Sequence, residues 1–216
     1  MPKSNDFYSK LPRDFYEEIS RTANPVRWLF HTSRWNTIRK LVEASSYSKD
    51  KIIIDVGCGN CMWNVGRLPV VGIDVNKSML DFALKKGNIS KAVACDFTKK
   101  LPLRSSSADI IVSSEVLEHI TNYSHLISEF HRVLKPKGRL VLSVPYDVPM
   151  SLWRPLFTLQ CFLRGTLMGE EYYKRNCGHI NAFSPETLKS SLEKKGFRII
   201  KQKVSFLMTI FILAEK

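Results

Sequence analysis

The first fifty residues carry apolar side chains at the three-to-four spacing that is typical of helices. Residues 15–22 and 26–42 both follow this pattern, and Pro25 separates the two predicted helices. A polar, serine-rich stretch at 44–50 then ends the pattern. We therefore expect residues 1–50 to form an N-terminal helical arm, ahead of a main domain over residues 51–216.

After residue 50 the pattern changes to short apolar runs that alternate with helical stretches. Strands that are apolar throughout, and that are separated by helices, indicate a parallel sheet covered by helices on both faces. The predicted strands are 52–56, 68–75, 92–95, 108–113 and 139–144, and the predicted helices between them are 78–86 and 123–134.

The C-terminal part predicts a different connection between strands. Ser184 is a good N-cap, and the proline and glutamate after it favour a first helical turn, so we expect a helix from there to Gly196. Residues 197–206 and 209–215 then form two strands with almost no connector, which predicts an antiparallel hairpin. The predicted fold class is α/β, a three-layer Rossmann-like sandwich whose mostly parallel sheet ends in this hairpin.

The alternation of strands and helices pauses between residues 146 and 182. This segment is basic and rich in aromatic side chains, and we predict that it forms a lid-like insertion in the main domain. Such side chains could cover the apolar body and the phosphate or sugar head of a substrate. The residues concerned are Trp153, Arg154, Phe157, Phe162, Arg164, Tyr172 and Tyr173.

The composition is that of an ordinary globular chain, with 44% apolar and 25% charged residues, which excludes a disordered, collagen-like or coiled-coil protein. An excess of 33 Lys+Arg over 20 Asp+Glu gives a net charge of +13. Such a charge attracts nucleic acid, anionic lipid surfaces and phosphorylated substrates. Because the charge is spread along the chain, it does not indicate whether it serves to bind RNA, to bind lipid or only to keep the protein soluble.

The cysteines and the hydrophobic runs suggest a compartment. Five cysteines lack the spacing of a disulfide scaffold, and residues 1–10 are too polar for a signal peptide, so we expect a reducing, cytoplasmic location. The longest apolar run, 205–214, is about half of the ~20 residues that a membrane-spanning helix needs, which leaves peripheral contact with a membrane open. Cys58 and Cys61 form a C-x-x-C pair without a second pair at zinc spacing, so we expect no metal.

Acidic residues mark the ends of the first four predicted strands. Ligands of open α/β sheets bind outside the carboxyl ends of the strands, so these side chains are expected to surround one crevice. Gly57 and Gly59, between the first two strands, permit a tight turn and a close approach of the ligand. The four acids are Asp55, Asp74, Asp96 and Glu115.

The chemistry of these acids bears on the ligand. A nicotinamide dinucleotide fold also has a Gly-x-Gly turn, but its third glycine would fall at Met62, and Asp55 would repel a pyrophosphate. The nucleotide cofactor that has no phosphate and carries a sulfonium and an ammonium is S-adenosylmethionine. Asp74 could accept from both ribose hydroxyls, and Asp96 from the adenine amino group. The predicted cofactor-binding residues are Asp55, Gly57, Cys58, Gly59, Asp74, Val75, Asp96, Phe97, Ser114 and Glu115.

Several segments resemble the class I S-adenosylmethionine-dependent methyltransferases, in particular the type 11 subgroup. The resemblance implies S-adenosylmethionine as methyl donor and a seven-stranded sheet with a reversed last strand. The chain departs from the family's pattern at Cys61, where a third glycine is usual, and the helix after the turn is expected to be short. The segments are Ile54-Asp-Val-Gly-Cys-Gly-Asn60, Val71-Gly-Ile-Asp-Val-Asn-Lys-Ser-Met79, Ala94-Cys-Asp-Phe97, the stretch 108–120, Arg132-Val-Leu-Lys-Pro-Lys-Gly-Arg-Leu140 and Gly178-His-Ile-Asn-Ala-Phe-Ser184.

The acceptor of the methyl group is open at this stage. Methyl transfer needs an aligned nucleophile, and a general base only where that nucleophile begins protonated. His119 and His179 are the candidate catalytic bases. A small-molecule or lipid-like acceptor is the favoured hypothesis, a tRNA or other nucleic-acid acceptor is the alternative, and a non-catalytic module that binds S-adenosylmethionine or NAD is the third.

Overall fold

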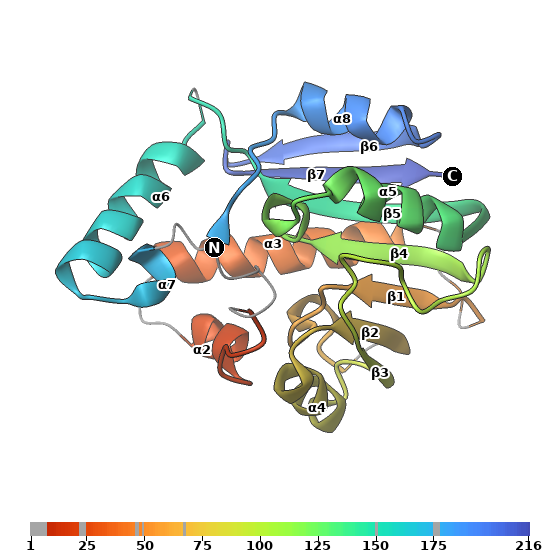
Figure 1. The fold of residues 1–216 in the computed structure, drawn as a ribbon, viewed down its shortest axis with the longest axis horizontal. Coiled ribbons are helices and arrows are strands. Elements are labelled where there is room, and N and C mark those ends of the chain that lie inside the picture. Colours follow the sequence, from red (N-terminus) through yellow and green to blue (C-terminus); the bar gives the residue numbers. More distant parts are fainter. Residues whose placement is uncertain are drawn as a thin grey trace.

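The computed structural model describes residues 8–21, 25–45, 48, 50–66, 68–149, 151–174 and 178–216. Seven strands form one sheet in the order β3-β2-β1-β4-β5-β7-β6 (Figure 1). All neighbouring strands are parallel except β7, which runs antiparallel to both β5 and β6. This arrangement confirms the predicted sheet with its C-terminal hairpin. The strands are β1 Ile53–Val56, β2 Val70–Asp74, β3 Lys91–Ala94, β4 Ala108–Ser114, β5 Leu134–Pro145, β6 Arg198–Ser205 and β7 Thr209–Glu215.

Helices cover both faces of the sheet. Successive residues of a strand point to opposite faces, so Ile54 packs into one hydrophobic cluster and Ile53 into another. The first cluster takes its helical side chains from α5 (Tyr123–Val133) and α8 (Pro185–Glu193). The second takes them from α3 (Pro25–Glu43) and α4 (Lys77–Lys86). The core is therefore the two interfaces of a three-layer sandwich.

Helix α3 belongs to the second helical layer, although the sequence placed it in an N-terminal arm. Its Ile38 and Val42 are fully buried against the sheet. The arm also contributes the short helix α2 (Phe15–Ser20) and the turn before it, which lie near the carboxyl ends of β1 and β2 (Figure 1). The boundary at residue 50 is thus a change of sequence pattern within one packed body.

The structure extends one predicted strand and agrees with the expected short helix after the glycine turn. Strand β5 begins at Leu134, directly after α5, because Leu134 already pairs with Ala108 on β4. The helix after the glycine turn is a single 3-10 turn, Met62–Asn64, which agrees with the expectation of a short helix.

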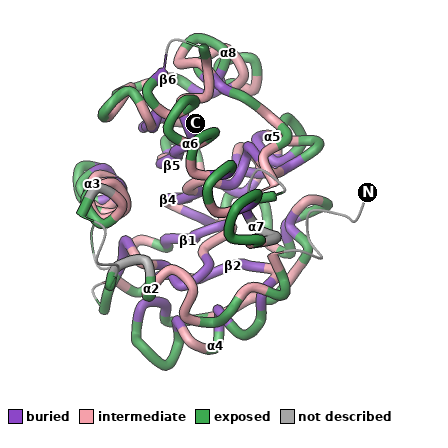
Figure 2. The backbone as a smooth tube through the Cα atoms, turned by 90° about the vertical axis from the view of Figure 1, so that its left-hand side faces the viewer, coloured by how far each residue is buried: buried purple, intermediate pink, exposed green. Residues whose placement is uncertain are grey.

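The insertion forms its own group of helices beside α3. It contains α6 (Trp153–Cys161), a π-helical stretch at Phe162–Leu167 and the short α7 (Glu171–Lys174). Most of α6 is exposed, whereas the central strands are buried (Figure 2). Within the described residues, no helix is both long and apolar enough to cross a membrane.

Candidate functional site

The turn after β1 has a conformation that requires glycine. Gly57 has φ of +73° and Gly59 has φ of +49°, a region that other residues rarely adopt. The amides of Gly57 and Cys58 donate to the carbonyl of Ile73 on β2, at 2.8 and 3.1 Å. A Cβ at Gly57 would lie 2.5 Å from Val116, so the backbone is packed closely as well as turned.

A cavity opens where this turn meets the carboxyl ends of β1, β2 and β4. Seven predicted site residues line it, namely Gly57, Gly59, Asp74, Val75, Phe97, Glu115 and His119. The sequence did not single out six further lining residues, namely Tyr8, Leu11, Tyr16, Met79, Val116 and Ile120. No lysine or arginine is among the described residues that line it.

Asp74 is held by the backbone at the rim of the cavity. One carboxylate oxygen accepts from the amide of Gly59 and the other from the amide of Asn76, both at 2.8 Å. Burial raises the pKa of Asp74, while these hydrogen bonds oppose that shift. Each oxygen keeps a further lone pair, so the carboxylate can still accept from two hydroxyl groups of a ligand.

Asp55 does not face the cavity, contrary to the prediction. Its carboxylate accepts from the indole nitrogen of Trp63 at 2.8 Å and from the thiol of Cys61 at 3.2 Å, behind the turn. The side chain is almost completely buried there, and burial raises the pKa of Asp55 to about 7. The short 3-10 turn brings Trp63 and Cys61 over the strand end, which is why the carboxylate points away from the mouth.

Three other predicted cofactor residues also lie off the cavity. Asp96 is exposed and accepts from the amide and hydroxyl of Thr98, at 3.1 and 2.6 Å, in a local turn. The sulfur of Cys58 packs toward Gly72 on β2. The hydroxyl of Ser114 lies 2.8 Å from that of Ser143. A strand end places a residue near the edge of the sheet, but local bonding decides which way its side chain turns.

Glu115 lines the cavity from the end of β4 and is already paired on its other side. It has φ of +58°. Its carboxylate accepts from the hydroxyl of Ser143 at 2.8 Å and forms an ion pair with Arg34 of α3 at 3.2 Å. The arm helix therefore fixes one of the two acids of the cavity.

The described part of the arm before α3 forms a roof over the cavity. The side-chain amide of Asn76 donates to the carbonyls of Tyr8 and Leu11, at 2.8 and 3.0 Å. That of Asn60 donates to the carbonyl of Arg13 at 2.8 Å. The ring of Tyr16 lies against Gly59, where an added Cβ would be 2.8 Å away. Asn60 and Asn76 follow the glycine turn and β2, which was the only sequence signal for these contacts.

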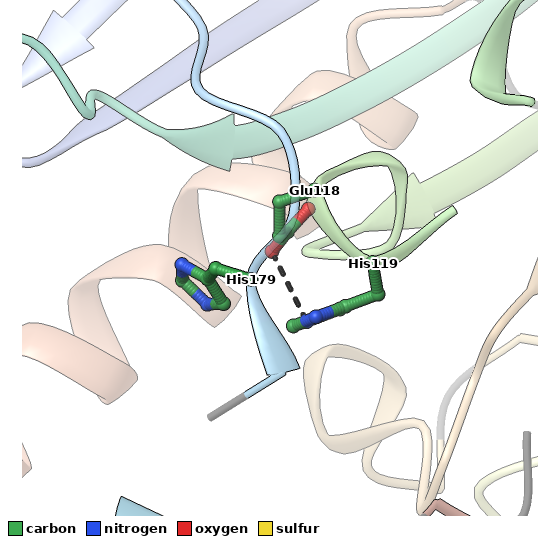
Figure 3. A group of neighbouring side chains, drawn as sticks. All are labelled: Glu118, His119 and His179. Atoms are coloured by element: carbon green, nitrogen blue, oxygen red, sulfur yellow. Dashed lines mark ion pairs between the residues drawn. The ribbon is translucent and has the colours of Figure 1, made fainter. Parts of the chain in front are cut away.

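His119 and His179 come together beside the cavity, with ring centroids 4.8 Å apart. Burial lowers the pKa of His119 to about 4 and that of His179 to about 3, so both rings are neutral at pH 7. The Nδ1 atom of His119 lies 3.1 Å from the carbonyl oxygen of Gly178. Glu118, the residue before His119, is buried next to them (Figure 3).

A stack of aromatic rings extends from His179 toward the insertion. The ring of Phe157 stacks on His179 at 5.0 Å, Trp153 stacks on Phe157 at 4.9 Å, and Phe30 of α3 stacks on Trp153 at 5.6 Å. The stack joins α3 and α6 to the histidine pair. It therefore leads from the inner end of the insertion to the cavity.

The donor set of the cavity fits S-adenosylmethionine. Asp74 offers acceptors for ribose hydroxyls, Phe97 offers a ring face for adenine, and Glu115 offers negative charge for a cationic end. A pyrophosphate would meet two carboxylates and no basic side chain among the described lining residues.

Comparisons with known proteins agree with this chemistry. The model of a family described as a methyltransferase domain, type 11, matches residues 54–142. An uncharacterized protein of Methanocaldococcus jannaschii is 30% identical over 149 residues, which are 67% of this chain and 61% of that protein. A ubiquinone/menaquinone biosynthesis C-methyltransferase of Paraburkholderia xenovorans is 30% identical over 143 residues, 59% of this chain and 56% of that protein. The chain thus spans about six tenths of the length of these curated relatives.

A solved structure extends the likeness to the whole fold. The magnesium protoporphyrin IX methyltransferase of Synechocystis, determined with bound SAH, has a TM-score of 0.71. The alignment covers 98% of this chain and 97% of that one, at 17% sequence identity. The two proteins therefore share a fold although their sequences are only distantly similar. Together with the methyltransferase relatives, the matched family model shows a methyltransferase domain of the S-adenosylmethionine-dependent type at residues 54–142 of this chain.

Proposed function

We propose that this protein transfers the methyl group of S-adenosylmethionine to a small acceptor with an apolar, lipid-like body. The observation that carries this proposal is the apolar surface of the insertion, which continues into the aromatic stack at His179. Eight large apolar side chains of the insertion are at least 43% exposed: Leu152, Leu156, Leu159, Phe162, Leu163, Leu167, Met168 and Ile180. A patch of this kind on a soluble domain favours contact with an apolar ligand or surface.

The relatives support the same class of acceptor. One relative is a ubiquinone/menaquinone biosynthesis C-methyltransferase. Another, from Coxiella burnetii, is a ubiquinone biosynthesis O-methyltransferase, 28% identical over 148 residues. An acceptor with an apolar tail could lie along the insertion while its reactive head reaches the cavity.

In this proposal the chain's own residues mainly position the reactants. Asp74 holds the ribose, Phe97 covers the adenine, and the roof formed by Tyr8, Leu11 and Tyr16 keeps water from the cavity. The cofactor supplies a methyl group on a sulfonium, whose carbon–sulfur bond breaks as the acceptor atom forms its bond to that carbon. Where the acceptor atom begins protonated, His119 or His179 receives the proton if its neutral ring keeps a free nitrogen lone pair; where that lone pair binds a cation, the proton leaves to water.

The test is to incubate the purified protein with isotope-labelled S-adenosylmethionine and an extract, and to identify by mass spectrometry the molecule that gains the label. Label in an apolar small molecule supports the proposal. Label in RNA, with binding that weakens steeply as salt rises, replaces the acceptor with a nucleic acid. Binding of the cofactor with no transfer to any fraction would contradict catalysis.

A variant in which a short Gly-Ser linker replaces residues 151–174 distinguishes the binding of the acceptor from the binding of the cofactor. The insertion leaves and rejoins the domain at adjacent points, because Tyr146 and Phe183 form a bridge, so a linker can span the gap. We expect this variant to bind S-adenosylmethionine as the wild type does and to lose transfer. Unchanged turnover would show that the insertion does not receive the acceptor.

A further inference from the structure

Three metal-binding side chains converge beside the cavity. Glu118 and His119 lie on the turn after β4, and His179 lies on the segment that leads to α8 (Figure 3). One ligand atom from each of the three lies within 4.8 Å of the other two. Atoms that share one ion at about 2.1 Å lie roughly 3 to 4 Å apart, so small side-chain adjustments would complete a site.

The backbone holds these two segments in place. The amides of Ile180 and Asn181 both donate to the carbonyl of Glu118, at 2.8 and 3.0 Å. The side-chain amide of Asn181 donates to the carbonyls of Leu117 and Ile120, both at 2.9 Å. The geometry of the cluster is therefore set by hydrogen bonds that do not use the metal-binding atoms.

The cluster has polar atoms that nothing among the described residues satisfies by a hydrogen bond. Glu118 is 1% exposed, and neither of its carboxylate oxygens has a hydrogen-bond partner there. Its Oε1 atom lies 3.6 Å from the Nε2 atom of His119, whose ring is neutral at pH 7. The Nδ1 atom of His179 is also buried without a hydrogen-bond partner. Burying a carboxylate in this way is costly unless a cation or a proton compensates for it.

The tautomer of His119 suits a metal ligand. Its Nδ1 lies 3.1 Å from the carbonyl oxygen of Gly178, which favours the hydrogen on Nδ1 and leaves the lone pair on Nε2, toward Glu118. The hydroxyl of Tyr8 lies 3.1 Å from the same Nε2. A cation there would compete with Tyr8, so its binding would be coupled to the roof.

We propose that Glu118, His119 and His179 bind one divalent cation of a first-row transition metal, such as zinc or manganese. Two imidazoles and one carboxylate suit these ions, and three protein ligands leave coordination positions open. Because His119 lines the cavity, an open position would take an oxygen of the methyl acceptor, which favours an acceptor with a hydroxyl or phenol group. This assignment of the acceptor rests on the proposed function, whereas the binding of the cation does not.

The experiment uses the full chain after removal of metal with a chelator. Zn²⁺ is titrated against a chromophoric indicator, and Co²⁺ is followed by its visible spectrum. We expect one ion per chain for the wild type, and at least about 100-fold weaker binding for Glu118→Gln and His179→Gln. His125→Gln removes a histidine of α5 whose Nε2 atom lies 2.7 Å from the carbonyl oxygen of Lys99, and this variant should bind zinc as the wild type does.

The outcomes separate the site from its alternatives. No zinc binding by the wild type, or equal affinity in Glu118→Gln and His179→Gln, overturns the proposal. Thiolate charge-transfer bands with Co²⁺ would mean that a cysteine sulfur binds the ion, and they would overturn the proposed ligand set as well. Binding of S-adenosylmethionine by each variant reports correct folding. Failure of zinc binding leaves methyl transfer standing, whereas zinc binding without methyl transfer contradicts only the proposed function and the acceptor.

Discussion

The candidate site has two halves that are built differently, one that we propose binds the cofactor and one that we propose receives the acceptor. In the cofactor half, formed by the glycine turn and β2, the backbone satisfies the functional carboxylate, as the two amides on Asp74 show. The acceptor half is formed by the turn 117–119 and residues 146–182, and side chains rather than backbone groups line it. Its buried atoms without hydrogen-bond partners among the described residues include both carboxylate oxygens of Glu118 and the indole nitrogen of Trp153. A backbone-built half suits a constant ligand, whereas a side-chain-built half can be adapted to a particular acceptor.

The largest expected effect concerns stability, at the carboxylate enclosed behind the cofactor half. The pKa of Asp55 is about 7 in the folded protein, against 3.8 for a free aspartate, so the folded state retains a proton that the unfolded state loses between about pH 4 and pH 7. This group therefore makes the protein less stable as pH rises through that window. For Asp55→Asn we expect the fall in unfolding free energy from pH 4.5 to pH 8 to be smaller by roughly 3 kcal/mol.

Chemical denaturation at several pH values measures this difference. Comparing the pH slopes rather than the absolute stabilities removes the constant cost of placing an amide beside Trp63. Titrating groups that do not interact with Asp55 act equally in both proteins, and the pH range ends below the raised pKa of Cys58 and Cys61, which do interact with it. Equal pH slopes for the wild type and Asp55→Asn would mean that the carboxylate is solvated, as it would be at the mouth of the cavity.

The next largest effect concerns the cofactor half directly. Asp74→Asn removes the negative charge that we expect the ribose hydroxyls to contact, and an amide cannot accept from both backbone amides and the ligand in the same way. Charge-assisted hydrogen bonds contribute roughly 1.5 to 3 kcal/mol each, so we expect S-adenosylmethionine to bind about 100-fold more weakly. Calorimetry measures the affinity. Asp96→Asn is the matched control, because Asp96 is turned into a local bend, and it should bind the cofactor as the wild type does.

The same comparison predicts a different response in the acceptor half. Trp153 stacks on Phe30, Phe157 and His179, so Trp153→Ala removes the centre of the aromatic stack. Aromatic pairs contribute about 0.5 to 1.5 kcal/mol each, and we expect kcat/KM for the acceptor to fall at least about tenfold with no change in cofactor affinity. Thr158→Ala, on the exposed side of α6, provides the control. Equal losses for cofactor and acceptor would mean that the two halves are one structural unit.

The sequence predicted the features that depend on backbone conformation. Its predictions differ from the structure where the orientation of a side chain depends on its local hydrogen-bond partners. Alternating apolar runs predicted the sheet, and the Gly57 and Gly59 pattern predicted the turn and its neighbour Asp74. Asp55 and Asp96 occupy the predicted strand ends. However, Trp63 donates a hydrogen bond to the carboxylate of Asp55 and Thr98 to that of Asp96, outside the cavity. The argument for a cationic cofactor therefore rests on Asp74 and Glu115 rather than on four acids.

Contacts between distant segments were the least predictable part of the site. The roof over the cavity depends on amide groups reaching carbonyls of the arm, such as Asn76 and Tyr8, and no periodicity reports such a contact. The approach of His179 to Glu118 likewise depends on how the segment before α8 returns to the sheet. Sequence spacing cannot supply that path, because it depends on the tertiary packing.

The smallest predicted effect tests whether the roof joins the two halves. The side chain of Asn76 caps α4, where its Oδ1 atom accepts from the backbone amide of Met79. Its Nδ2 atom donates to the backbone carbonyls of Tyr8 and Leu11. Asn76→Asp preserves the cap, since aspartate is an equally good N-cap, but it replaces the donor with an acceptor that faces two carbonyls. The arm should then open more often, and we expect S-adenosylmethionine to dissociate roughly fivefold faster, as the loss of about 1 kcal/mol would produce. Stopped-flow displacement measures the rate, and cleavage near residue 13 by a protease should rise in parallel. A dissociation rate equal to that of the wild type, with the same thermal midpoint, would show that the arm covers the cavity without holding the cofactor in it.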